Sequence, residues 1–204
     1  MLKVGLTGSI AVGKSFVCDV FGELGCHILD ADQVARDLVS PGTKGLRQVV
    51  ESFGNSVLLA DGSLDRSKLG SIVFADEEKR LQLNSIVHPL VIEAQDEWLA
   101  AREHEDPRGI AVIEAALMIE AGGYKRYDKL IVVWCKPEIQ LNRLMLRDNL
   151  SPADASRRIA SQMPQDEKKR YADFLIDTSN GFDETRRQST EVFSHLSVLV
   201  GQTS

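Results

Sequence analysis

Residues 8–15 read Gly8-Ser9-Ile10-Ala11-Val12-Gly13-Lys14-Ser15, and this stretch decides the fold. It fits the pattern G-x-x-x-x-G-K-[S/T] in full, follows an apolar run at residues 2–7, and precedes an amphipathic helical pattern. The two glycines permit a tight turn whose backbone N–H groups converge on an anion, and the N-terminus of the following helix adds unsatisfied donors and partial positive charge. The sequence therefore predicts a phosphate-binding loop, or P-loop, between a strand and a helix.

The residues of this loop have distinct expected roles toward a nucleoside triphosphate. Lys14 supplies a full positive charge for the β- and γ-phosphates, which also makes it a candidate catalytic residue. The Ser15 hydroxyl is placed to ligate Mg²⁺. ATP and Mg²⁺ are therefore the expected cofactors. The other loop and first-turn residues expected to contact ATP are Gly8, Ala11, Val12, Gly13 and Phe16.

Outside the loop, short apolar runs alternate with amphipathic helical patterns, which is typical of βαβ units and a parallel sheet. A long, mainly helical stretch follows the second run, and we expect it to form a helical lobe at about 41–104. Pro89 lies inside that pattern and predicts a kink or a break in a helix. Five strands are expected, at residues 2–7, 26–29, 110–114, 129–134 and 174–176.

Two aspartates, Asp30 and Asp32, follow the second apolar run. Ligands of parallel sheets bind at the carboxyl ends of the strands, so a carboxylate here can accept the proton of an attacking hydroxyl. The same charge repels a phosphate monoester, which favours an alcohol acceptor over a nucleoside monophosphate. Either aspartate can instead cap the next helix. We predict Asp32 as the base, and Arg36, one turn later, either binds substrate phosphate or pairs with Asp32.

Further charged residues are candidates for the same site. Glu114 ends the third strand, where it either supports Mg²⁺ or is a surface carboxylate. Arg143 and Arg147 share one face of a helix. They either bind ATP from a mobile lid at about 143–164, with Arg143 as a catalytic and Arg147 as an ATP-binding residue, or they are solvated or paired with Asp148.

Composition excludes several classes of protein. The formal net charge is −6 and the pI is near 5.3, so a general nucleic-acid-binding surface is not expected. The N-terminus lacks the pattern of a signal peptide and the apolar runs are too short to cross a membrane, which predicts a cytoplasmic location without membrane partners. The three cysteines are widely spaced and predict buried free thiols. A monomer is favoured.

Several motifs, in order along the chain, resemble the dephospho-coenzyme A kinase family. They predict an α/β, P-loop kinase-like fold: one domain over residues 1–204, with a five-stranded parallel sheet covered by helices on both faces, a helical substrate lobe and a short lid. The motifs are Gly5-Leu6-Thr7-Gly8, Gly13-Lys14-Ser15, Asp30-Ala31-Asp32-Gln33-Val34-Ala35-Arg36, Leu83-Asn84, His88-Pro89-Leu90, residues 117–120, Gln140-Leu141-Asn142-Arg143, Arg147-Asp148, Arg158-Ile159, Gln162, Ala172-Asp173 and Ile176-Asp177.

The resemblance implies transfer of the ATP γ-phosphoryl group to the ribose 3′-hydroxyl of dephospho-coenzyme A, the last step of coenzyme A synthesis. It implies that Arg158 and His88 help Asp32 and Arg36 to bind this substrate, although a histidine such as His88 in an apolar helical pattern is otherwise structural. The alternative is another P-loop kinase of a small alcohol, such as a sugar acid or shikimate. A GTPase switch is less favoured, because the chain has no N-K-x-D element.

Overall fold

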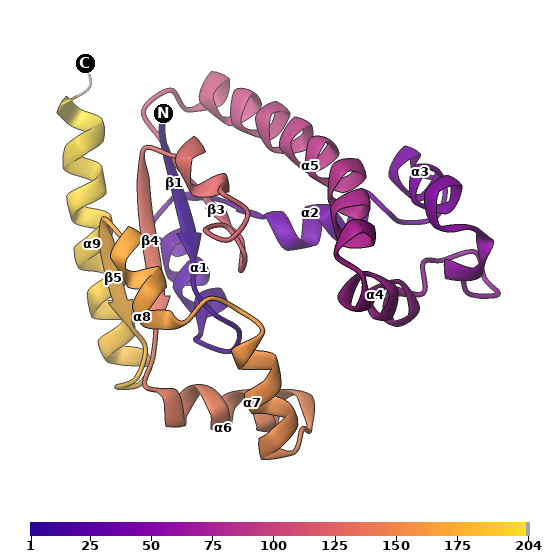
Figure 1. Ribbon diagram of the computed structural model, residues 1–204. Helices are drawn as coiled ribbons and strands as arrows, with labels where there is room; N and C mark the ends of the chain where they lie inside the picture. Colours follow the sequence, from indigo (N-terminus) through magenta and orange to yellow (C-terminus); the bar gives the residue numbers. More distant parts are fainter. Residues whose placement is uncertain (203–204) are drawn as a thin grey trace. The chain divides into compact units, whose positions relative to one another are not determined.

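The computed structural model describes residues 1–202 and contains a five-stranded, all-parallel sheet (Figure 1). The strand order is β2-β3-β1-β4-β5, so the first strand lies in the middle of the sheet. The predicted α/β architecture is confirmed, with the second strand shifted by one residue and the fifth extended by one. The strands are β1 (Leu2–Thr7), β2 (His27–Asp30), β3 (Ile110–Glu114), β4 (Lys129–Trp134) and β5 (Phe174–Asp177).

The chain forms two compact units. The first comprises Met1–Asp30 and the chain from Ala101 onward, and it holds the whole sheet. The second comprises Ala31–Ala100 and is helical. The first unit contains α1 (Lys14–Glu23), η2 (Gly123–Arg126), α6 (Pro137–Asp148), α7 (Pro152–Ala160), α8 (Gln165–Lys168), η3 (Lys169–Tyr171) and α9 (Phe182–Gln202). The second contains α2 (Ala31–Asp37), α3 (Lys44–Phe53), η1 (Asn55–Val57), α4 (Arg66–Ala75) and most of α5 (Glu77–Glu105).

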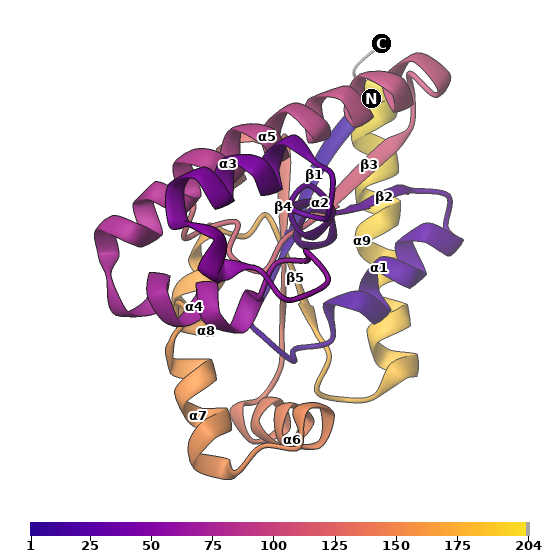
Figure 2. The same cartoon turned by 90° about the vertical axis from the view of Figure 1, so that its right-hand side faces the viewer.

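Alternation along β1 explains how the sheet is covered. Val4 and Leu6 are fully buried in the main core, on the face where α1 and α9 pack against each other and against the strands (Figure 2). Gly5 faces the opposite side, where a side chain would collide with Met118 and Tyr127. The segment after β3 therefore covers the second face of the middle strand.

Helix boundaries in the first unit follow the expected end signals. Helix α1 ends at Glu23, and Gly25 comes two residues later with a φ of 94°, in the left-handed region that glycine adopts without strain. Pro137 occupies the first turn of α6, where its missing N–H costs no hydrogen bond. Ser151 caps α7 by accepting a hydrogen bond from the N–H of Asp154.

The second unit has a core of its own, formed by α3, η1, α4 and the first half of α5. A kink or a break was expected at Pro89. The break is wrong, because α5 continues through this residue from Glu77 to Glu105, and the kink stays a prediction. The carbonyl that loses its hydrogen bond belongs to Ser85, an exposed residue, so water can satisfy it.

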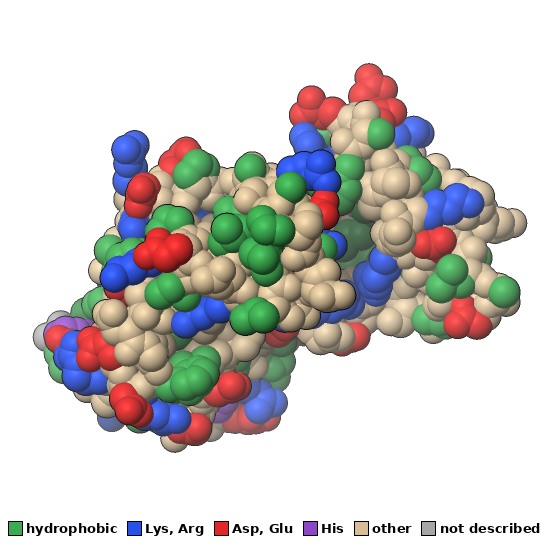
Figure 3. Space-filling model, turned by 90° about the horizontal axis from the view of Figure 1, so that it is seen from below, with side chains coloured by type: hydrophobic (Ala, Val, Ile, Leu, Met, Phe, Trp, Pro, Cys, Tyr) green, Lys and Arg blue, Asp and Glu red, His purple; other side chains and the backbone are tan. Residues whose placement is uncertain are grey.

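The distribution of charged side chains and the burial of the cysteines agree with the expectations from the sequence. On the face that Figure 3 shows, acidic and basic side chains are interspersed instead of forming a broad field of one sign. The three cysteines, Cys18, Cys26 and Cys135, are free and buried, as predicted. Within residues 1–202, no helix combines the length and apolar character that a bilayer span requires.

Candidate active site

The P-loop begins directly after β1 and ends at the N-terminus of α1. Only glycine fits at position 8 without a steric clash, because a Cβ atom on Gly8 would lie 2.3 Å from the carbonyl oxygen of Val133. Gly13 precedes α1 with a φ of 93°, and no side chain within residues 1–202 caps this helix end. The first-turn N–H groups are therefore open to an anion, as the sequence pattern predicts.

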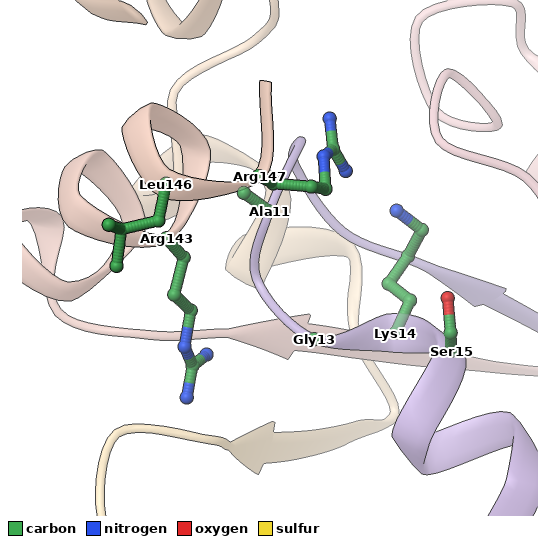
Figure 4. A pocket seen from close by; sticks show the side chains of 7 residues that line it. All are labelled: Ala11, Gly13, Lys14, Ser15, Arg143, Leu146 and Arg147. Carbon is green, nitrogen blue, oxygen red and sulfur yellow. The ribbon is translucent and has the colours of Figure 1, made fainter. Parts of the chain in front are cut away.

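Next to the loop lies a cavity of about 520 Å³ (Figure 4). Lys14 and Arg143 reach it from opposite sides of Gly13, and Ser15 lies beside Lys14. None of the lining residues is acidic, so the cavity is positive although the protein is acidic overall. The lining residues are Ala11, Gly13, Lys14, Ser15, Arg143, Leu146 and Arg147.

A second cavity of about 160 Å³ shares Gly13 and Arg143 with the first. Phe16 and Phe182 contribute its aromatic wall, with ring centroids 4.8 Å apart. The predicted ATP-binding residue Val12 lines neither cavity, since its side chain is fully buried in the core. Val12 therefore serves the loop through its backbone.

Lys14 lies beside Glu114, the last residue of β3, which is the strand that pairs with β1. Its Nζ is 3.7 Å from Oε1 of Glu114, and the two side chains are only 11% and 15% exposed. The Cys18 thiol, one helical turn after Lys14, donates to the other carboxylate oxygen at 3.5 Å. Burial and the charge of Glu114 raise the pKa of Cys18, so the thiol stays protonated and can donate. The Glu114 carboxylate is thus held in place at the end of β3 by Lys14 and Cys18, and it is not a surface group.

The oxygen atoms of Ser15 and Glu114 are suitable ligands for a Mg²⁺ ion that is bound together with a nucleotide. The Ser15 hydroxyl is exposed at the loop and Glu114 ends β3 in the same unit. Residues 1–202 hold no cluster of three or more histidine, cysteine, aspartate or glutamate side chains suited to a metal ion. Mg²⁺ needs no such cage, because it usually keeps several waters and binds one or two protein groups plus substrate phosphates.

Arg143 is fixed against the base of the P-loop. Its guanidinium donates to the hydroxyl and the carbonyl of Thr178, both at 2.8 Å, and to the carbonyl of Val12 at 3.4 Å. The Thr178 hydroxyl in turn donates to the same Val12 carbonyl at 2.6 Å. The end of β5 thereby holds both the loop and the arginine, so Arg143 is a preorganised cation of the cavity.

Arg147 and Arg158 share one carboxylate. Arg147 pairs with Asp148 at 2.8 Å, and Arg158, from α7, reaches the other oxygen of Asp148 at 2.8 Å. These arginines, Arg147 first, hold the pKa of Asp148 below its ordinary value. The side chains of both arginines remain about half exposed, so a polyanion can reach them. Pairing with Asp148 and binding a ligand are therefore not exclusive alternatives.

The acidic pair after β2 is divided between the two units. Asp30 is the last residue of β2 and pairs in register with Glu114, so two carboxylates lie side by side at the carboxyl ends of β2 and β3. Asp32 lies in the first turn of α2, in the second unit. Arg36 lies in the last turn of α2 and donates to Gln33 at 3.0 Å, and His88 is exposed on α5.

Sequence reasoning assigned no role to several residues that hold the loop. Thr178 has no motif of its own in the sequence, and Cys18 is predicted there only as a buried thiol. Gln140 and Gln162 occur in the motifs quoted above, yet nothing in their spacing shows that they contact the P-loop. Both hydrogen-bond to Ile10, which only the folded chain brings near them.

The fold and the site together define a P-loop kinase-like α/β protein: a parallel sheet, a phosphate loop after its central strand and cations around the loop. The family model for dephospho-CoA kinase (CoaE) matches residues 2–184. A dephospho-CoA kinase of Listeria monocytogenes serotype 4b is 46% identical over 187 residues, covering 91% of this chain and 92% of that protein.

Two solved structures are similar to the chain over nearly its whole length. A dephospho-CoA kinase from Campylobacter jejuni is 30% identical with a TM-score of 0.70, covering 96% of both chains. The protein TT1252 from Thermus thermophilus is 26% identical with a TM-score of 0.84, covering 95% of this chain and 96% of that one. The chain belongs to the dephospho-CoA kinase family.

Proposed function

We propose that this protein transfers the γ-phosphoryl group of ATP to the ribose 3′-hydroxyl of dephospho-CoA, giving CoA and ADP. The observation that carries the proposal is the match of the family model to residues 2–184, which include the whole P-loop and its cationic cavity. Kinase activity toward dephospho-CoA follows from the family. The position of the phosphate and the roles of single residues are the parts proposed here.

The triphosphate is proposed to lie in the larger cavity. The open N–H groups of α1 and the Lys14 ammonium support this placement, since both favour an anion at this point. Arg143 is proposed to stabilise charge on the transferred group and Arg147 to bind ATP. The smaller cavity, walled by Phe16, is proposed to take the nucleoside end because an aromatic wall suits a base.

Mg²⁺ is proposed to bind the nucleotide phosphates with the Ser15 hydroxyl and with Glu114 or its water shell. When bound, the ion neutralises charge on the phosphates of ATP. The contribution of the chain is to hold Glu114 in place, through the Cys18 thiol, before nucleotide arrives. The same carboxylate keeps the Lys14 ammonium near the cavity.

Asp32 is proposed as the base that accepts the proton of the attacking hydroxyl. Chain geometry supports this role, because two residues span at most about 7 Å between Cα atoms. Asp32 therefore lies close in the chain to Asp30, which pairs in register with Glu114 at the carboxyl ends of β2 and β3. Arg36, His88 and Arg158 are proposed to bind dephospho-CoA. The other small-alcohol kinases, of sugar acids or shikimate, are not favoured, since the family match is to dephospho-CoA kinase.

The three buried free thiols support a location in the reducing cytoplasm. The expectation of a monomer stays a prediction, which light scattering on the purified protein tests.

An acceptor panel tests the proposed reaction. ADP release is measured with ATP and Mg²⁺ in the presence of dephospho-CoA, shikimate, gluconate or no acceptor, and the product is analysed by ³¹P NMR. We expect turnover with dephospho-CoA alone and a new phosphate on the ribose 3′-oxygen. Faster turnover with shikimate or gluconate, or a phosphate elsewhere on the ribose, contradicts the proposal.

Asp32→Asn tests the base. We expect turnover to fall by about 10²–10⁴-fold, as for the loss of a general base, while ATP affinity stays within a few fold of the wild type. The matched control is Asp37→Asn, in the last turn of the same helix, where the carboxylate accepts a hydrogen bond from Gln33. Turnover of Asp32→Asn close to that of the control would exclude Asp32 as the base.

A further inference from the structure

One peptide segment of the P-loop is held from both sides by glutamine side chains. The N–H of Ile10 donates to Oε1 of Gln162 at 2.8 Å, and the carbonyl of Ile10 accepts from Nε2 of Gln140, also at 2.8 Å. Gln140 lies in α6 and is only 2% exposed, while Gln162 follows α7. Two successive peptide planes of the loop are therefore fixed by residues more than a hundred positions away.

We call the two contacts of Gln140 and Gln162 with Ile10 the clamp. From Gln140 the clamp continues as a chain of hydrogen bonds with a fixed direction. The N–H of Cys135, just after β4, donates to Oε1 of Gln165 at 3.0 Å, and Nε2 of Gln165 donates to Oε1 of Gln140 at 2.8 Å. A backbone N–H can only donate and the carbonyl of Ile10 can only accept. The orientation of both intervening amides is thereby determined, and such a chain strengthens its members cooperatively.

The backbone conformation of Ala11, next to the clamp, needs to be stabilised by contacts with other parts of the structure. Ala11 has a φ of 60°, in the left-handed region that a residue with a Cβ occupies at a cost. Residues in such conformations persist only where the surroundings determine them. Gln140 fixes the peptide between Ile10 and Ala11, and therefore the torsion at which Ala11 enters this region.

We propose that Gln140 and Gln162 are positioning residues for the reaction: they hold the P-loop in its phosphate-binding shape before the nucleotide arrives. Neither side chain lines the phosphate cavity, so both act through Ile10. The inference rests on the proposed binding of ATP at this loop. It assigns a role to two motif residues that the fold alone leaves without one.

The effect should appear in nucleotide affinity. Without the clamp, the loop must be ordered at the moment of binding, and this cost lowers the affinity for ATP. Once bound, the phosphates themselves hold the loop, so turnover at saturating ATP changes less. Loss of one buried hydrogen-bonded partner predicts an increase of about tenfold in Kd.

The experiment uses Gln140→Met and Gln162→Met, which keep side-chain length and remove hydrogen bonding. Binding of a non-hydrolysable ATP analogue with Mg²⁺ is measured by calorimetry, and kcat and KM for ATP are measured with dephospho-CoA. We expect both variants to raise Kd and KM about tenfold and to change kcat less than threefold. Gln165→Met, which interrupts the chain one step further away, should give a smaller increase in the same direction.

The control is Asp128→Ala, at the other end of the sheet. Its carboxylate accepts a hydrogen bond from the N–H of Lys3 at 2.8 Å, so its loss also removes a contact between a side chain and the backbone. We expect it to lower thermal stability without changing KM for ATP. A clamp variant that behaves like Asp128→Ala overturns the proposal.

Hydrogen exchange on the wild-type protein gives an independent test that needs no variant. The Ile10 amide should be protected in the absence of nucleotide, and in Gln162→Met it should exchange at least tenfold faster. Unprotected Ile10 in the wild type overturns the clamp. By contrast, a wild-type protein that binds the analogue but does not phosphorylate dephospho-CoA refutes the proposed reaction and leaves the clamp intact.

Discussion

Replacing Gly8 by alanine tests the role of the P-loop's first residue most directly. The added Cβ would lie 2.3 Å from the carbonyl oxygen of Val133 and 3.0 Å from a methyl group of Val12. An ordinary van der Waals contact begins at 3.4 Å, so the first of these distances is about 1 Å too short. The collision is with backbone of β4, which cannot rotate away as a side chain can.

The loop must therefore move by about 1 Å relative to β4. A misplacement of this size at a reacting group costs about 10²-fold in rate, and overpacking of this kind destabilises a fold by about 1–3 kcal/mol. We expect Gly8→Ala to remain folded, with a lower unfolding midpoint and with kcat/KM for ATP reduced about 10²-fold. The larger share of that loss should be in nucleotide affinity, because the N–H groups of the loop no longer converge.

Circular dichroism, urea unfolding and calorimetry with an ATP analogue measure these changes. Gly22→Ala is the matched control, because Gly22 lies within α1 and its added Cβ meets nothing closer than 3.7 Å. This variant should be neutral or stabilised by about 0.5–1 kcal/mol, as alanine favours a helix over glycine. Wild-type ATP affinity in Gly8→Ala would refute the steric argument and the assignment of the loop.

Three further substitutions test other parts of the structure. Lys168→Met removes a fully buried ammonium that lies 2.9 Å from Glu120 and donates to the carbonyl of Ala116. It should lower the free energy of unfolding in urea by about 1–3 kcal/mol, because both acceptors lose a donor while Glu120 stays within reach of water; a loss below about 0.5 kcal/mol would show that these contacts are not structural. Thr178→Val keeps the side-chain shape but loses the hydrogen bond to the carbonyl of Val12, and it should raise KM for ATP several-fold in steady-state kinetics. An unchanged KM would exclude Thr178 as a support of the loop. Burial raises the pKa of Cys26 to about 12 from 9.0, so the folded state keeps its proton while the unfolded state loses it. The contribution of Cys26 to the free energy of unfolding should therefore fall by about 1.4 kcal/mol per pH unit between pH 9 and pH 12, and Cys26→Ala should lack this component when urea unfolding is compared at pH 8 and pH 10.

The sequence predicts those parts of the structure that depend on local pattern. The strand, loop and helix around residues 8–15 follow from two glycines, a lysine and the change of apolar period. The remaining strands follow from short apolar runs, and only their ends differ, because one residue at a strand terminus is decided by pairing with a neighbour. Glu114 was placed correctly at the end of β3, since a strand end can be read from the sequence.

What could not be predicted depends on contacts between distant segments. Thr178, Gln140 and Gln162 have ordinary polar side chains, and only the folded chain brings them to the carbonyl of Val12 or the peptide of Ile10. Pro89 shows the opposite limit of local rules. Its pattern allowed a break or a kink, and the exposed position of Ser85 lets the helix continue without a break.

The pairing of Lys14 with Glu114 explains how an acidic protein keeps a phosphate site ready. A buried ammonium without a partner would be costly, and the neighbouring carboxylate offsets that cost while the cavity holds no anion. Under the proposed binding of ATP with Mg²⁺, a phosphate group would replace Glu114 as the partner of Lys14, and Glu114 would then be able to support the ion. The same reasoning applies to Asp148, which pairs with Arg147 at the cavity and with Arg158 from α7. On this proposal, each cation with a carboxylate partner would exchange that partner for phosphate, whereas Arg143, which donates to the neutral groups of Thr178, would keep its position.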